Sequence, residues 1–142
     1  MTTAKPPAWF WIVAVLALAW NLMGVGAYIA DVTMNEEALA ALSDAERQLR
    51  ESTPGFVTGA YAIAVFAGLG AAIALLMRRK PAIVLFGVSL AAVVLQMGYV
   101  FLVMKAAAVL GSESMTLPGI IILLSAFQLW LALTSARAGW IS

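Results

Sequence analysis

The chain has 142 residues, of which 64% are hydrophobic and 11% are charged, and its formal net charge is +1. An ordinary soluble domain is excluded, because charged residues make up about a quarter of such domains. Nucleic acid is excluded as a partner, because no basic stripe is present. Since Cys and His are absent, we expect no metal, no cofactor and no enzyme activity.

The first predicted element is an apolar run over residues 8–30, long enough for a helix that crosses a bilayer. Asn21 lies inside this run and follows Trp20. Because an amide in hydrocarbon must find a hydrogen-bond partner, Asn21 either links two helices or belongs to a ligand site. Trp20 lies away from the interfacial layer where tryptophan is common, which favours the ligand site.

The segment over residues 31–53 is polar, and two capping-box patterns lie in it, Thr33-x-x-Glu36 and Ser43-x-x-Glu46. Each pattern is typical of a helix start, so the segment predicts two short helices that form a cap over the bundle. Asp31 ends the first span at the same depth as Lys105 ends the third. We therefore expect an ion pair between Asp31 and Lys105, with a gate as the alternative role.

The second and third spans are predicted over residues 55–77 and 81–104. Only three basic residues, 78–80, join them, which predicts a helical hairpin. Small residues recur every four positions from Ala60 to Ala72, a pattern that lets helices approach closely in lipid. The third span contributes Gln96 and Tyr99 as candidate ligand-binding residues.

The fourth span is predicted over residues 117–136, after a loop over residues 105–116 that shows only ordinary turn chemistry. It carries Gln128 and, two positions later, Trp130. The three amides of the spans fall at similar depths and are expected to share one layer. With neighbouring aromatic rings they form a candidate site for a small polar solute, made by Asn21, Gln96, Gln128, Trp20, Trp130 and Tyr99.

The charged residues sort between the two sides of the membrane once these spans are drawn. Lys5, the cluster at 78–80 and Arg137 fall on one side with no acid among them, whereas all seven acids fall on the other. Because short cytoplasmic loops retain Lys and Arg, both termini are predicted to be cytoplasmic. The expected fold is an all-α, antiparallel four-helix bundle of a bacterial inner membrane, forming one transmembrane domain over residues 1–142.

Four motifs carry a likeness to known proteins: residues 5–11, which are rich in Trp, the sequence Trp20-Asn21-Leu22-Met23-Gly24, the outer run 33–46, and Gln96-Met97-Gly98-Tyr99. In these motifs the chain resembles a group of small bacterial four-span inner-membrane proteins known as sugar transporters or sugar-transporter-like. It departs from other small helical sugar carriers by lacking their Pro-Gln helix break.

Two functions remain open from the sequence. The resemblance implies a facilitator for a small, sugar-like solute that works as a homo-oligomer in the lipid bilayer. The alternative is a non-catalytic accessory or assembly subunit of a larger inner-membrane complex, which would use the small residues of its spans and its acidic cap as contact surfaces.

Overall fold

The computed structural model describes residues 4–142, and that part of the chain is helical and contains no strand. Four long helices dominate it: α1 (Ala8–Val32), α4 (Gly55–Leu76), α5 (Pro81–Gly98) and α7 (Thr116–Arg137). The prediction of an all-α fold with four long apolar helices is confirmed. The shorter elements are α2 (Glu36–Ala40), α3 (Asp44–Ser52), the π-helix η1 (Tyr99–Val103), α6 (Ala106–Leu110) and the 3₁₀ helix η2 (Ser112–Met115).

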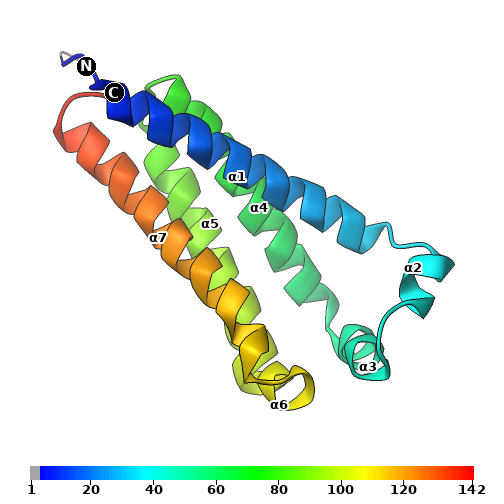
Figure 1. Ribbon diagram of the computed structural model, residues 1–142. Coiled ribbons are helices and arrows are strands. Elements are labelled where there is room, and N and C mark those ends of the chain that lie inside the picture. Colours follow the sequence, from blue (N-terminus) through cyan, green and yellow to red (C-terminus); the bar gives the residue numbers. More distant parts are fainter. Residues whose placement is uncertain (1–3) are drawn as a thin grey trace.

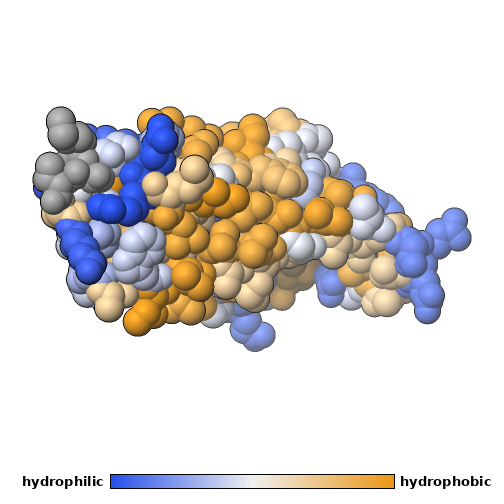
Figure 2. All heavy atoms as spheres, turned by 90° about the horizontal axis from the view of Figure 1, so that it is seen from above, coloured by the Kyte–Doolittle hydropathy of each residue, from blue (hydrophilic) through white to orange (hydrophobic). Residues whose placement is uncertain are grey.

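The sides of the bundle are strongly apolar. Leu16 is 63% exposed, Leu102 78% and Leu123 71%. Figure 2 shows hydrophobic residues over the middle of the visible face, with most hydrophilic residues gathered towards the two ends. Because a soluble protein rarely exposes such a continuous apolar surface, and because each long helix can cross a bilayer, the structure indicates a multi-pass membrane protein.

The long helices pack in chain order, with α1 on α4, α4 on α5 and α5 on α7 (Figure 1). The predicted small-residue ladder of α4 is buried, from Ala60 through Ala64 and Gly68 to Ala72. Small side chains allow close approach of neighbouring backbones, which places α4 and α5 against each other along their lengths. α4 is therefore the most buried of the four spans.

Both ends of the described chain meet the turn between α4 and α5, at what we call the terminal end of the bundle (Figure 1). Arg78 Nε donates to Trp140 O at 2.7 Å, and Arg78 Nη2 donates to Ala4 O at 2.8 Å. The backbone of Ser142 exchanges hydrogen bonds with Arg78 and Lys80. A single arginine thus ties the two chain ends to the hairpin.

The opposite end carries α2, α3 and α6, and we call it the cap end. The predicted cap at Ser43 is confirmed, because its Oγ accepts a hydrogen bond from the Glu46 amide at 3.1 Å. The predicted cap at Thr33 is wrong. The Thr33 hydroxyl donates to Ile29 O at the end of α1, and Asn35 caps α2 instead. The helix α1 simply continues past residue 30, so Thr33 satisfies its last turn.

The prediction of a plain turn over residues 105–116 is also wrong. α5 widens into η1, Lys105 takes a left-handed conformation with φ of 54°, and α6 then forms before Gly111 ends it with φ of 97°. The Ala-rich sequence of α6 has high helix propensity, which explains a short helix where only a loop was expected. Gly111 accommodates the positive φ without strain.

Candidate functional site

A polar centre lies halfway along the bundle, between α1 and α7. Asn21 Nδ2 donates to Gln128 Oε1 and to Ala17 O, both at 2.7 Å. Both side chains are buried, with 9% and 5% exposure. Two of the three predicted amides therefore meet in one layer, and each satisfies the other where water is absent.

Gly68 of α4 makes room for this centre. A Cβ built on Gly68 would lie 2.3 Å from Asn21 Oδ1 and 3.2 Å from the Ser89 hydroxyl. The Ser89 hydroxyl donates to Ala64 O at 2.6 Å, which joins α5 to α4 at the same level. The amide of α1 thus rests directly on the backbone of α4, a contact that only glycine permits.

A central pocket of about 410 Å³ opens from the polar centre towards the cap end. All four long helices line it, and none of its lining residues is charged. Its polar groups come from Asn21, Tyr61, Ser89, Gln96 and Ser125, and the rest of the wall is mostly apolar. This volume falls within the range of small-molecule sites.

Several polar groups of the central pocket have no protein partner. Within residues 4–142, the Ser125 hydroxyl, the Gln96 amide and Asn21 Oδ1 make no hydrogen bond, and all three residues line the central pocket. Ser125 is only 8% exposed and lines this pocket. An apolar cavity with a few unused donors and acceptors can orient an uncharged polar ligand.

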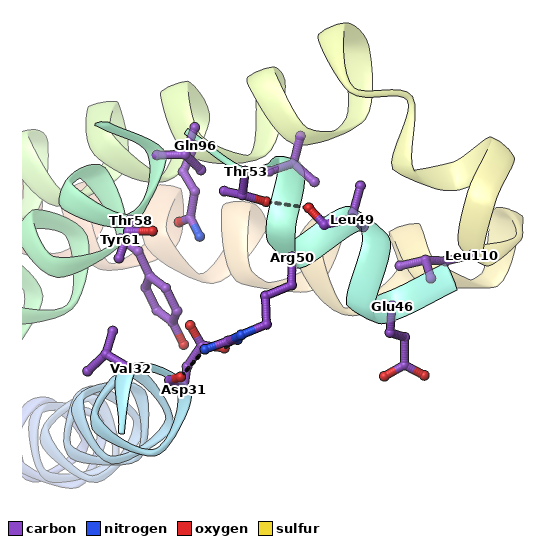
Figure 3. Close-up of a pocket in the computed structure, with 12 residues that line it drawn as sticks. Asp31, Val32, Glu46, Leu49, Arg50, Thr53, Thr58, Tyr61, Gln96 and Leu110 are labelled. Atoms are coloured by element: carbon purple, nitrogen blue, oxygen red, sulfur yellow. Dashed lines mark hydrogen bonds and ion pairs between the residues drawn. The ribbon is translucent and has the colours of Figure 1, made fainter. Parts of the chain in front are cut away.

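A second hollow, the cap pocket, has a volume of about 380 Å³ and lies between α3 and the ends of α1, α4 and η1. Tyr61 and Gln96 line both pockets and therefore stand at the boundary between them. Figure 3 shows their side chains turned into the cap pocket, with the Tyr61 ring directed towards Asp31. The Tyr61 ring also packs edge-on against Tyr28 of α1 at 5.1 Å.

The predicted ion pair between Asp31 and Lys105 does not form in the described chain. Asp31 Oδ1 instead receives Arg50 Nη1 at 2.7 Å, and Arg50 Nη2 donates to the Asp31 carbonyl (Figure 3). Lys105 is exposed at the start of α6. The reason is that α3 brings Arg50 to the end of α1. At the end of the third span, the π-helix and the left-handed conformation of Lys105 change the direction of the chain.

The terminal half of the bundle is closed. Phe10, Leu75, Phe86 and Leu131 come from the four long helices and pack together at 0–2% exposure. The cluster of the cap half is smaller and draws its members from α4, α5 and α7 only. Both pockets thus lie on the cap side of this closely packed cluster.

Three candidate residues lie outside the pockets. Trp130 is 54% exposed on the apolar surface and stacks at 32° on Phe127. Tyr99 packs edge-on against Phe56 at 4.9 Å. Gln128 supports Asn21 from α7 without lining either pocket. Trp20, Asn21 and Gln96 line the central pocket.

Ser89, Ser125 and Arg50 were not singled out from the sequence. Spacing offers a signal for the two serines, because Ser125 precedes Gln128 by three positions and Ser89 precedes Gln96 by seven, which puts each pair on one helix face. Arg50 gave no such signal, because its partner depends on how residues 33–53 fold back. No family model, curated protein or solved structure matches the chain in the comparisons with known proteins.

Proposed function

We propose that the protein belongs to a bacterial inner membrane, with its terminal end in the cytoplasm and its cap end in the periplasm. The distribution of charge supports this orientation. The basic residues 78–80 lie at the terminal end, whereas Glu36, Glu37 and Asp44 lie at the cap end. With short cytoplasmic loops retaining Lys and Arg, the four spans alternate in direction as an antiparallel up-and-down bundle.

Within that membrane the protein is a non-catalytic facilitator for a small, uncharged, hydroxylated solute of the sugar-like kind. The observation that carries this proposal is the unused set of Asn21 Oδ1, Gln96 and Ser125 in an uncharged central pocket. Amide and hydroxyl groups match the hydroxyls of such a solute and need no charged partner. The resemblance to sugar-transporter-like proteins points to the same chemistry.

The order of the cavities defines a path. A solute from the periplasm enters the cap pocket, passes Tyr61 and Gln96, and reaches Asn21 in the central pocket. Release to the cytoplasm requires the helices to separate at the buried cluster around Phe10 and Phe86. In a homo-oligomer, the helices of neighbouring protomers can move against one another to allow this separation. Because the central pocket holds no carboxylate, any coupling to protons would have to run through Asp31 of the cap pocket.

Reconstituted liposomes test the proposal by light scattering after a hyperosmotic glucose step. Protein-containing liposomes are expected to re-swell faster than empty ones. The double variant Gln96→Leu, Ser125→Ala is expected to slow the protein-dependent rate about tenfold, because two ligand hydrogen bonds are lost. Since neither side chain is hydrogen-bonded to the described chain, the helical fold should be retained, as circular dichroism will show.

The matched control is the double variant Gln48→Leu, Ser112→Ala. Both residues are exposed and lie outside the two pockets. The control should conduct like the natural protein. Equal re-swelling rates with the natural protein and with the pocket variant would contradict the proposed site. A re-swelling rate with the natural protein that equals the rate of empty liposomes would exclude glucose-like solutes as substrates.

A second candidate function is that of an accessory subunit. It is favoured by the incomplete packing of the cap half, where α1 contributes nothing to the buried cluster and leaves a side that another helix can fill. Extraction in mild detergent should then recover the protein with a stoichiometric membrane partner. Recovery as an isolated protomer or as a homo-oligomer would contradict this function.

A further inference from the structure

The central pocket is open on one side, between the cap halves of α1 and α7. In the terminal half all four long helices share one buried cluster, but in the cap half the cluster lacks α1. The hydrogen bond between Asn21 and Gln128 joins the two helices at the boundary between these regions. Beyond it α1 and α7 lie apart in Figure 1.

The rim of this opening faces the surroundings of the bundle. Met23 of α1 is 68% exposed and Leu117 of α7 is 59% exposed, and both also line the central pocket. In a membrane the surroundings at this level are the hydrocarbon of the cap-side leaflet. The pocket therefore faces lipid through an apolar rim, and it shares Tyr61 and Gln96 with the cap pocket.

The polar groups and the apolar rim of the pocket suit different parts of one ligand. The unused groups of Asn21, Gln96 and Ser125 are uncharged donors and acceptors, which suit hydroxyls and would leave a phosphate or carboxylate without a cationic partner. The rim of Met23 and Leu117 suits an alkyl chain. A wholly water-soluble sugar would leave the rim in contact with lipid and unused.

We infer that the ligand of the central pocket is a neutral single-chain amphiphile from the outer leaflet, with a hydroxylated head group as in a monoacylglycerol or an alkyl glycoside. Its head binds among Asn21, Gln96 and Ser125, and its chain leaves between α1 and α7. The pocket volume of about 410 Å³ accommodates the head group and the first part of the chain, and the rest of a long chain extends between α1 and α7. The inference rests on the proposed function and names the substrate class of that site.

The test uses the full chain in lipid nanodiscs with a monoacylglycerol that carries a photoreactive diazirine on its alkyl chain. After illumination, adducts are located by mass spectrometry of peptides. They are expected to concentrate on Met23 and on Leu117 with Ile121, and to be displaced by unlabelled monoacylglycerol. A lysophospholipid of the same chain length, which carries a charged head, should displace them about tenfold less well, because the site offers no counter-charge.

Variants separate a specific site from ordinary lipid contact. The double variant Gln96→Leu, Ser125→Ala should lower the rim adducts about tenfold, whereas Gln48→Leu, Ser112→Ala should not change them. Adducts spread equally over Leu16, Leu123 and the rim would overturn the inference, since the first two residues simply face lipid. Protection of the rim by contact between two protomers would overturn it as well.

Its failure is distinguishable from failure of the proposed function. Glucose flux that depends on Gln96 and Ser125, together with evenly spread adducts, would keep the facilitator and reject the amphiphile. Rim adducts that depend on the same residues would support the amphiphile site, and absence of glucose flux in that case would reject only transport of free sugars.

Discussion

At the residue scale the buried amides show how polar groups are accommodated in this apolar chain. Asn21 donates two hydrogen bonds and leaves its oxygen facing Gly68 and the central pocket. The same side chain therefore links α1 to α7 and, in the proposed function, offers an acceptor to a ligand. The two interpretations of Asn21 drawn from the sequence, link and ligand site, use different atoms of one amide and do not exclude each other.

Replacement of Gly68 by alanine is expected to destabilise the bundle by about 1–3 kcal/mol. The new methyl group would lie 2.3 Å from Asn21 Oδ1, so the amide must move and its bond to Gln128 is strained. Gly87→Ala is the matched control, because its Cβ would meet nothing within 4 Å in a helix of the same bundle. Unfolding midpoints in detergent measure both variants, and equal effects would contradict the close contact.

The bond between Asn21 and Gln128 is expected to show a coupling free energy of about 0.5–2 kcal/mol in a double-mutant cycle. The variants are Asn21→Leu, Gln128→Leu and the pair, with unfolding measured in mixed micelles. Each single change leaves the other amide without its partner on the facing helix, so the double variant should lose less than the sum of the two. Strict additivity would show that the two amides do not interact.

At the element scale, the short helices of the cap end shape the cap pocket. α3 packs against α6, and Arg50 fastens it to the end of α1. The π-helix η1 follows α5 without a break and contributes Val100 to the cap pocket. π-helical turns occur often at functional sites, and here the widened turn lies beside the entrance of the proposed path.

Arg50→Gln is expected to loosen the cap without unfolding the bundle. The ion pair with Asp31 is partly exposed, with side chains 32% and 43% accessible, so its contribution to global stability is below about 1 kcal/mol. Hydrogen exchange over α3 should nevertheless rise, because Arg50 holds that helix to α1. Arg47→Gln is the control, since Arg47 pairs with Asp44 at 3.8 Å and donates to Ala40 O and Leu42 O, whereas its bonds do not reach α1. Equal exchange in both variants would refute the role of Arg50.

At the scale of the whole molecule, the closed terminal half and the hollow cap half differ in packing. The terminal half contains the larger apolar cluster, and there Arg78 is hydrogen-bonded to both ends of the described chain. The cap half carries both pockets. A molecule closed at one end and open at the other corresponds to one conformation of a transport cycle in the proposed function.

The proposed orientation predicts how single cysteines react in intact cells. The natural chain has no Cys, so each introduced thiol is the only one present. Arg79→Cys should be protected from a membrane-impermeant maleimide, because it lies at the terminal end, whereas Glu37→Cys at the cap end should be labelled. Labelling of the first and protection of the second would invert the orientation and assign the cap to the cytoplasm.

The four long helices could be predicted from the sequence alone, because a continuous apolar run of about twenty residues can satisfy its backbone in lipid only as a helix. The sequence also indicates where charges gather, since the charged residues fall mainly between these runs. The helix cap at Ser43 could also be predicted, because a cap depends only on a few neighbouring residues.

Which polar groups meet depends on how the helices pack in three dimensions. The long helices are apolar on all sides, so their sequences carry little periodic signal for the direction that each residue faces. Trp130 therefore turned out to lie on the apolar surface, Ser125 faced the central pocket, and Asp31 paired with Arg50 instead of Lys105. Depth along a span follows from counting residues, but rotation and tilt follow from packing against the other helices.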